Sequence, residues 1–309
     1  MALIPGKEIL AEANRGRFAI GHFNFNNLEF LQAIAAAADE TGSPMFIATS
    51  EGAIHYAGLE NLVALARSVA SGTSVPLCLH LDHGKDLELI HRCIEFGYTS
   101  VMIDASDLPF EQNLAKTRQV VEMARKTGAS VEAELGRLVG VEDNVSVKEH
   151  DAMLVDPDEA AKFVKESGVD SLAPAIGTSH GAFKFKGEPK LDFERLKQVK
   201  DATGDLPLVL HGASSVPKAV LERCLASGMK VGGAKGVPED QLVQAVGLGI
   251  NKVNVDTDLR LTFAAEVRKV FAEHPDQFDP RKYLGPGRDA VKKLVTDKIR
   301  LFRPGSRSD

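Results

Sequence analysis

In the stretch Leu79-His80-Leu81-Asp82-His83-Gly84, an apolar run ends in an acid, an imidazole and a glycine. A histidine followed by glycine returns at His180 and at His211, each time after another strand-like run. In a closed parallel barrel the carboxyl ends of all strands meet at one rim, where the active sites of such barrels lie. The pattern therefore predicts a (β/α)8 TIM barrel that gathers three imidazoles at its rim.

Short strand-like runs alternate with longer stretches of helical periodicity along the chain. The eight expected strands are Phe18–Phe23, Met45–Thr49, Pro76–Leu81, Ser100–Ile103, Ser130–Ala133, Ser171–Ala173, Leu206–Leu210 and Lys252–Val255. The helical stretches between them include Leu28–Thr41, Asn61–Ser71, Leu87–Phe96, Phe110–Thr127, Pro157–Glu166 and Leu191–Thr203. Several of these helices run into a glycine, a usual stop before the next strand. Such alternation favours parallel pairing, and eight strands close a (β/α)8 barrel.

An open doubly wound sheet is the alternative that the same alternation allows. Polar residues decide between the two folds, because they follow almost every expected strand. They include Asn24, Ser50, Asp82, Asp104, Glu134, His180, His211 and Asp256. A ring of chemistry drawn from all strand ends suits a barrel rim better than the single crevice of an open sheet.

Two regions differ from the short connections of the rest of the chain. Residues Leu135–Val155 lack clear periodicity, and their length predicts a mobile loop over the active rim. Residues Leu259 to Asp309 are expected to form a helical extension, broken around Leu284-Gly285-Pro286-Gly287. We expect a single domain over residues 1–309, with the barrel ending at about residue 258.

Composition excludes several classes of protein. The 309 residues carry a net charge of −6, and no basic block indicates a nucleic-acid partner or an anionic membrane surface. No apolar run is long enough to cross a bilayer, and the first residues lack the pattern of a secretion signal. Three scattered cysteines are expected to be ordinary thiols in a reducing cytoplasm.

The strand ends carry the residue types of an open metal site. Three neutral imidazoles bind Zn²⁺ and leave one coordination position for substrate, and Asp82 beside the first imidazole is placed for proton transfer. Glu132 and Glu134 share one strand face, and Asp104 ends the neighbouring strand. These carboxylates indicate a second metal position, with salt bridges or support of a ligand as the alternative.

The turns after the seventh and eighth strands are candidates for phosphate binding. Gly212-Ala213-Ser214-Ser215 and Asn254-Val255-Asp256-Thr257 follow those strands, where this fold often binds phosphate. Backbone N–H groups and hydroxyls would hold the dianion there, and plain turns are the alternative. We expect no lysine at a strand position inside the barrel, which disfavours chemistry through a Schiff base.

Six motifs together resemble one family, the class II, metal-dependent fructose-bisphosphate aldolases. They are Leu-Asp-His-Gly at 81–84, Ser-Val-Met-Ile-Asp at 100–104, Val-Glu-Ala-Glu-Leu-Gly at 131–136, Gly-Thr-Ser-His-Gly at 177–181, His-Gly-Ala-Ser at 211–214 and Asn-Val-Asp-Thr-Asp at 254–258. They occur in the family's order, from the first strand to about Gly287. The family's zinc-containing (β/α)8 barrel agrees with the fold expected from the residues.

The resemblance implies a role for each matching position. His83, His180 and His211 would bind the catalytic zinc, and Asp104 and Glu134 match a second divalent-metal position. A monovalent cation is a further ion that the family allows. Asp82 would exchange a proton with the C4 hydroxyl, and Glu142 in the long loop would move a proton at C3 of dihydroxyacetone phosphate.

The resemblance also implies how a phosphorylated sugar would be held. The ketose end and its phosphate would contact Gly181, Gly212, Ala213, Ser214, Asn254, Val255, Asp256 and Thr257. Ser50, Arg260 and the partner's Arg281 are candidates for the distal phosphate in a homodimer or homotetramer. His22 stands where a smaller residue is expected.

Three other functions compete with fructose-bisphosphate cleavage. Tagatose 1,6-bisphosphate differs only in its stereochemistry at C4, and the family resemblance favours fructose through residues 131–136 and 171–196. A metal-dependent barrel hydrolase would show a His-x-His pair on the first strand, where this chain has His22-Phe23-Asn24. A non-catalytic metal-binding barrel would not need the acid, base and phosphate candidates.

Overall fold

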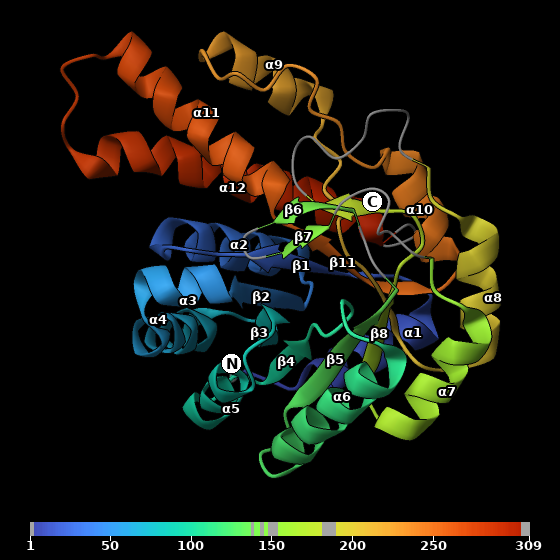
Figure 1. Cartoon of the computed structure of the whole chain (residues 1–309). Helices are drawn as coiled ribbons and strands as arrows, with labels where there is room; N and C mark the ends of the chain where they lie inside the picture. The colour runs from blue at the N-terminus through green and yellow to red at the C-terminus, as the bar shows by residue number, and fades with distance from the viewer. Residues whose placement is uncertain (1–2, 137–138, 143–144, 148–153, 181–189, 304–309) are drawn as a thin grey trace.

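A computed structural model describes residues 3–136, 139–142, 145–147, 154–180 and 190–303, and it contains a closed barrel of eight parallel strands (Figure 1). Around the barrel their order is β1-β11-β10-β8-β5-β4-β3-β2. Their bounds are β1 (Ile20–Asn24), β2 (Met45–Ser50), β3 (Leu77–Gly84), β4 (Ser100–Ile103), β5 (Ser130–Leu135), β8 (Ser171–Pro174), β10 (Leu208–Leu210) and β11 (Ile250–Val255). Each overlaps an expected strand, so the predicted barrel is confirmed.

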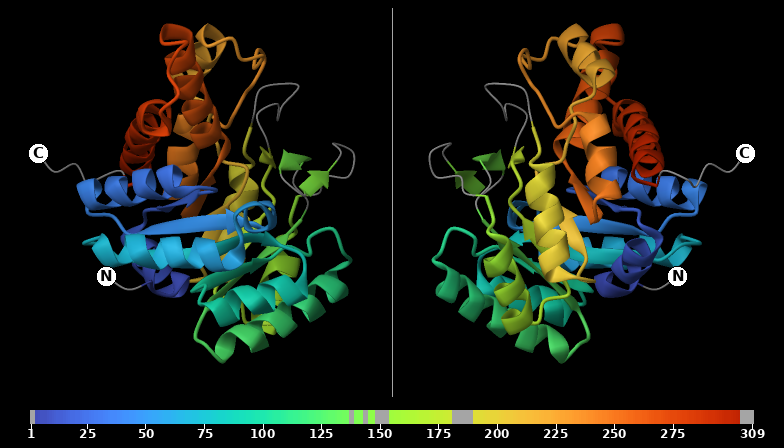
Figure 2. Two further views of the ribbon diagram at one scale, coloured as in Figure 1. Left: turned by 90° about the vertical axis from the view of Figure 1, so that its left-hand side faces the viewer. Right: turned by 90° about the vertical axis from the view of Figure 1, so that its right-hand side faces the viewer.

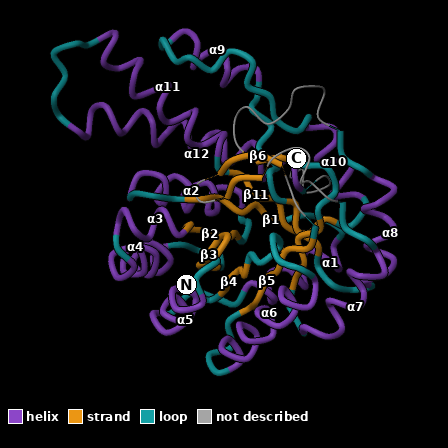
Figure 3. The backbone as a smooth tube through the Cα atoms, viewed as in Figure 1, coloured by secondary structure: helices purple, strands orange, loops and turns teal. Residues whose placement is uncertain are grey.

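Helices surround the barrel (Figures 2 and 3). Their bounds are α1 (Gly6–Gly16), α2 (Leu28–Thr41), α3 (Glu51–Ala57), α4 (Leu59–Gly72), α5 (Leu87–Phe96), α6 (Phe110–Arg125), α7 (Pro157–Ser167), α8 (Phe193–Thr203), α9 (Lys218–Ala226), α10 (Glu239–Gly247), α11 (Thr257–Glu273) and α12 (Pro280–Phe302). Gly42, Gly97 and Gly168 end helices α2, α5 and α7 with φ of 60°, 104° and 72°, as the predicted glycine stops require. Within these ranges, no helix is long and apolar enough to span a bilayer.

Strand β3 shows how the barrel separates its core from its chemistry. Side chains alternate between the two faces of a strand. Leu79 and Leu81 belong to the hydrophobic core shared with the surrounding helices. His80 and Asp82 are also buried, but they contact polar residues inside the barrel. The polar interior is therefore continuous with the rim at which β3 ends.

Helix α1, which the sequence analysis did not predict, closes the opposite end of the barrel. Its Ile9 and Leu10 form a small core with Ile20, Phe46 and Cys78, which lie at or near the starts of three strands. Chemistry is thereby confined to the rim at the carboxyl ends of the strands.

The segment expected as a mobile loop contains two strands instead. Strands β6 (Val139–Glu142) and β7 (Val145–Val147) pair antiparallel, and β6 also pairs in parallel with β9 (Ser179–His180). Valines at 139, 141, 145 and 147 alternate with other residues, a period-2 pattern that favours strands. The expectation of an irregular loop was therefore wrong for these residues.

The expected break in the C-terminal extension is absent, because α12 runs through Pro286 without interruption. A proline inside a helix removes one backbone hydrogen bond, but burial of Val291, Val295 and Phe302 anchors the following turns. Gly287 also serves the packing of α12 against α11, since a Cβ at this position would lie 2.8 Å from the ring of Phe263. The prediction of a broken helix was wrong.

Candidate active site at the rim of the barrel

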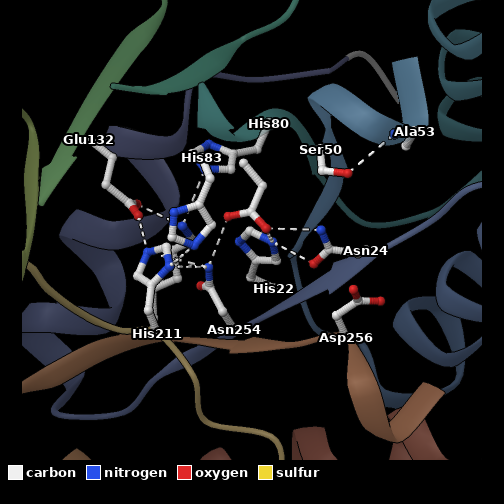
Figure 4. A network of polar contacts seen from close by, with 12 residues as sticks. His22, Asn24, Ser50, Ala53, His80, His83, Glu132, His211, Asn254 and Asp256 are labelled. Atoms are coloured by element: carbon white, nitrogen blue, oxygen red, sulfur yellow. Dashed lines mark hydrogen bonds and ion pairs between the residues drawn. The ribbon is translucent and has the colours of Figure 1, made fainter. Parts of the chain in front are cut away.

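Two of the three expected imidazoles meet at the rim. His211, directly after β10, places its Nδ1 2.9 Å from Nε2 of His83 on β3 (Figure 4). His83 has a φ of 49°, a conformation that is rare for residues other than glycine. The register of β3 with β4 shifts between Leu81 and Gly84, so His83 lies in an irregular last turn of the strand at the rim. The sequence prediction that His83 and His211 come together is confirmed.

A buried acid holds the His211 ring. Oε1 of Glu132 lies 2.8 Å from His211 Nε2, which donates to it, and Oε2 lies 2.6 Å from the ammonium of Lys252. This contact leaves His211 Nδ1 with its lone pair directed at His83. Burial lowers the pKa of His211 to about 4 and so favours the neutral ring that a metal requires.

Two further carboxylates lie on the other side of His83. Asp104 Oδ2 is 3.0 Å from His83 Nδ1, and Glu134 Oε2 is 3.9 Å from the same atom. Burial lowers the pKa of His83, but the charges of Asp82 and Asp104 outweigh burial and raise it to about 10. His83 is therefore protonated, and its positive charge balances the carboxylates as a bound cation would.

Glu134 supplies the clearest test of whether a metal fits. Its Oε2 is buried and has no hydrogen-bond partner among the described residues. Burial, and then the negative charge of Asp104, raises the pKa of Glu134 well above its usual range. A divalent ion held by His83, Asp104 and Glu134 would give the Glu134 oxygen a partner and offset the repulsion between the two carboxylates. Asp82, His83 and His211 form another candidate group. These donors fit a divalent cation.

Asp82 is held as an ionised base. Asn24 donates to its Oδ2 at 2.9 Å and Asn254 donates to its Oδ1 at 3.3 Å. Burial raises the pKa of Asp82, but the nearby imidazoles, His22 and His83 foremost, lower it well below its usual range. A carboxylate that is deprotonated, buried and fixed beside the imidazoles can accept a proton from a bound substrate.

The expected phosphate turns line the same small pocket. Gly212, Ala213 and Ser214 follow β10. Asn254 is the last residue but one of β11, and Asp256 follows that strand. The side chain of Val255 is instead buried in the hydrophobic core, so only its backbone is available there. Thr257 is the first residue of α11.

The three candidates for the distal phosphate lie in different surroundings. Ser50 is buried and caps α3 by accepting the Ala53 N–H (Figure 4). Arg260 forms a two-point ion pair with Asp256 at 2.9 and 2.7 Å. The side chain of Arg281 is 88% exposed at the start of α12, where the α11–α12 hairpin projects from the barrel (Figure 1). The structure does not bring Arg281 to the pocket of its own chain.

Three candidates fall wholly or partly outside the described residues. His180 lies on β9 opposite Gly140, and Glu142 ends β6, but the side chains of both are outside the description. Gly181 lies outside it entirely. The backbone pairing of β6 with β9 places the two segments side by side near the rim.

Lys252 is the residue that sequence reasoning misjudged. The expectation of no lysine inside the barrel was wrong, because Lys252 on β11 is fully buried and lies between Glu132 and His80. The sequence feature that could have predicted this burial is the position of Lys252 two residues before Asn254, which puts both side chains on the same strand face. The ion pair with Glu132 occupies its ammonium, so it supports the acid and is not free for Schiff-base chemistry.

Comparison with known proteins agrees with this geometry. The family model described as fructose-bisphosphate aldolase class-II matches residues 5–306. Curated fructose-bisphosphate aldolases from Helicobacter pylori and Thermus caldophilus are 54% and 48% identical over 97% of this chain and 98% of their own. The crystal structure of the YdjI aldolase from Escherichia coli K12 superposes with a TM-score of 0.79 at 33% identity, covering 99% of this chain and 100% of that one. The chain therefore belongs to the class II fructose-bisphosphate aldolase family and is an aldolase.

Proposed function

We propose that this chain cleaves fructose 1,6-bisphosphate reversibly into dihydroxyacetone phosphate and glyceraldehyde 3-phosphate, with zinc as its metal. The observation that carries the proposal is the placement of an ionised Asp82 directly beside the paired imidazoles His83 and His211. The names of the curated relatives support fructose bisphosphate over tagatose bisphosphate.

The zinc would be held by His83, His180 and His211. When bound, zinc supplies a Lewis acid for the negative charge that develops as the C3–C4 bond breaks. Asp104 and Glu134 would hold a second divalent ion, which the unpartnered oxygen of Glu134 supports. A monovalent cation is a further ion that we include in the proposal.

Proton transfer would be divided between two acids. Asp82 takes the proton of the C4 hydroxyl in the cleavage direction, and its two asparagine partners keep the carboxylate aimed at the pocket. Glu142 then delivers a proton to C3 of the departing ketose. Its position on β6, beside the strand that carries His180, supports this assignment.

The phosphates would be bound at two places. Gly181, Gly212, Ala213, Ser214 and residues Asn254 to Thr257 take the ketose end, supported by the pocket that several of them line. Ser50, Arg260 and the partner's Arg281 take the distal phosphate. The exposure of Arg281 away from its own pocket supports a homodimer or homotetramer.

We also propose that the barrel and its extension form one domain, residues 1–309, working in the cytoplasm. The Phe302 carbonyl accepts the Ala19 N–H at 3.0 Å, which ties the end of α12 to the start of β1. The three cysteines are free and buried, which supports a reducing compartment.

The decisive test is an aldolase assay of purified protein with fructose and tagatose bisphosphates in parallel. We expect cleavage of fructose bisphosphate to be lost on treatment with a chelator and restored by Zn²⁺. Faster turnover of tagatose bisphosphate would overturn the choice of substrate. Activity that resists complete metal removal would overturn the metal-dependent mechanism.

Variants at the two acids separate the half-reactions. Glu142→Ala should bind dihydroxyacetone phosphate yet exchange its C3 proton at least about 100-fold more slowly, the scale of a lost general acid–base. Asp82→Ala should cleave fructose bisphosphate at least about 100-fold more slowly but lose less of the exchange, because no C4 hydroxyl takes part. Deuterium wash-in measures the exchange, with Asp201→Ala on the exposed face of α8 as control. Normal exchange by Glu142→Ala would remove this residue from the mechanism.

A further inference from the structure

The turn after β10 ends in a strained conformation that a buried acid holds in place. Val216 has a φ of 45°, which is unusual for a β-branched residue and costs free energy unless its surroundings impose it. Its N–H donates to Oδ1 of Asp258 at 2.8 Å, and the preceding Ser215 N–H donates to Oδ2 at 3.0 Å. One carboxylate therefore fixes two successive backbone groups of the turn.

Asp258 is in turn paired with a lysine from the C-terminal extension. Asp258 is fully buried in the first turn of α11, and the ammonium of Lys298 on α12 lies 3.4 Å from its Oδ2. The side chain of Lys298 is 2% exposed, and its ammonium also contacts Glu239 at 2.8 Å and the Ser215 hydroxyl. Lys298 thus joins α12, α11 and α10 to the turn.

The turn is also held from its other side, where only a glycine fits. A Cβ at Gly236 would lie 2.2 Å from the Ser214 carbonyl oxygen and 2.4 Å from the carbonyl carbon of Ser215. The neighbouring Val237 N–H donates to the Ser214 carbonyl at 3.1 Å. Backbone contacts on this side and the Asp258 carboxylate on the other leave the turn little freedom to move.

We propose that Asp258 and Lys298 are positioning residues for the ketose phosphate, so that α12 takes part in substrate binding without touching substrate. The inference rests on the proposed function, which assigns Gly212 to Ser214 to that phosphate. Asp258 sets the turn from which these residues line the pocket. A buried carboxylate near a phosphate dianion would repel it, and the Lys298 ammonium compensates that charge.

The condensation reaction tests this role, because its two substrates have separate KM values. Lys298→Met keeps the length of the side chain and removes its charge. We expect its KM for dihydroxyacetone phosphate to rise at least about tenfold, as for the loss of a charged hydrogen-bond network. Its KM for glyceraldehyde 3-phosphate and its zinc content should stay at the wild-type level. Lys298→Arg, which keeps the charge, should recover part of the loss.

Lys293→Met is the matched control, since Lys293 lies on the same helix and pairs with Asp297 on the exposed face. It should leave both KM values unchanged. Asp258→Asn, which is similar in size and uncharged, provides a second variant if Lys298→Met accumulates poorly. An unchanged KM for dihydroxyacetone phosphate in whichever variant folds, or an equal rise for both substrates, would overturn the positioning role. Absence of aldolase activity in the wild-type enzyme would instead overturn the proposed function.

Discussion

Two buried lysines support the site from opposite directions. Lys252 lies inside the barrel, 2.6 Å from Glu132, and both residues belong to barrel strands. Lys298 lies between the barrel and its helical extension, 3.4 Å from Asp258, and both residues belong to helices. Each lysine pairs with a carboxylate that has a second task. Glu132 holds the imidazole of His211, whereas Asp258 holds the backbone of a turn.

The difference shows how one scaffold meets two chemical requirements. A metal ligand must present one ring nitrogen in one direction, and a carboxylate bound to the other nitrogen sets that direction. A phosphate site built from backbone needs a fixed main chain, and a carboxylate that accepts two N–H groups provides it. In both places the lysine offsets the cost of burying the acid. We therefore propose that the inner pair, Lys252 and Glu132, serves the metal site, and that the outer pair, Lys298 and Asp258, serves the phosphate.

The largest effect is expected when the imidazole that the inner pair holds is removed. His211→Ala should lose the tightly bound zinc, about one ion per chain in the wild type, together with its aldolase activity. The turn that ends in Val216 should be unaffected, so inorganic phosphate should still raise the melting temperature of His211→Ala. Metal analysis by mass spectrometry checks the loss, with the exposed His274→Ala as control. Full zinc and full turnover in His211→Ala would refute the metal assignment.

A smaller effect is expected from Glu132, which contacts the proposed metal ligand His211. Glu132→Gln leaves the Lys252 ammonium buried and unpaired, which should cost about 3–5 kcal/mol of unfolding free energy. The double variant Glu132→Gln with Lys252→Met removes that charge and should recover most of the stability. Its zinc affinity should remain about 10- to 100-fold below the wild type, because His211 has lost its charged partner.

Urea unfolding and competition with a chelator measure the two effects separately. The comparison between inner and outer pairs predicts that the double variant keeps the wild-type KM for dihydroxyacetone phosphate. A rise of that KM as large as the one for Lys298→Met would erase the distinction. Wild-type zinc affinity in the double variant would show that Glu132 does not orient His211.

The smallest effect concerns the pH dependence of the outer pair. Burial raises the pKa of Glu239, but its hydrogen bond with Lys298 and the lysine's charge outweigh burial and lower it from the usual 4.5. A lowered carboxyl pKa contributes stability above about pH 4.5, and that contribution is lost as the pH falls through the folded-state value. The free energy of unfolding should therefore fall more steeply below about pH 4.5 in the wild type than in Glu239→Gln.

The effect should be small because the Glu239 side chain is half exposed. Glu222→Gln removes an ion pair that is exposed on both partners, and it should leave the steep fall unchanged. If the unfolding free energy of the wild type and of Glu239→Gln depended equally on pH, the ion pair of Lys298 with Glu239 would contribute no stability, and the pair with Asp258 would be the one that matters.

Sequence patterns were sufficient for the barrel and for much of its rim. Strand runs, glycine stops and the polar residues after each strand depend on local chemistry, so they are sufficient to predict His83, His211, Asp82 and Asn254 at one end of the barrel. The valine alternation of β6 and β7 was present in the sequence but was interrupted by glycine and acids. It became decisive only through pairing with β9, which lies more than thirty residues further along the chain.

The supporting residues could not be predicted in the same way. From sequence alone a lysine is predicted to lie on the surface unless its carboxylate partner is known. Lys252 contacts Glu132 only once β5 and β11 are both part of the closed barrel. Lys298 is 83 residues from Ser215, and their contact depends on how α12 docks. The docking in turn uses Gly287, which as a local signal indicated a helix break. Long-range packing decided these positions.

The chain order of the barrel strands also has a consequence for newly made protein. Strand β1 pairs with β2 on one side and with β11 on the other. A ribosome delivers β1 early and β11 late, so one edge of β1 stays open through most of translation. Lys298 follows later still. All eight barrel strands are thus synthesised before Lys298, on which the turn that ends in Val216 depends for its lysine contact.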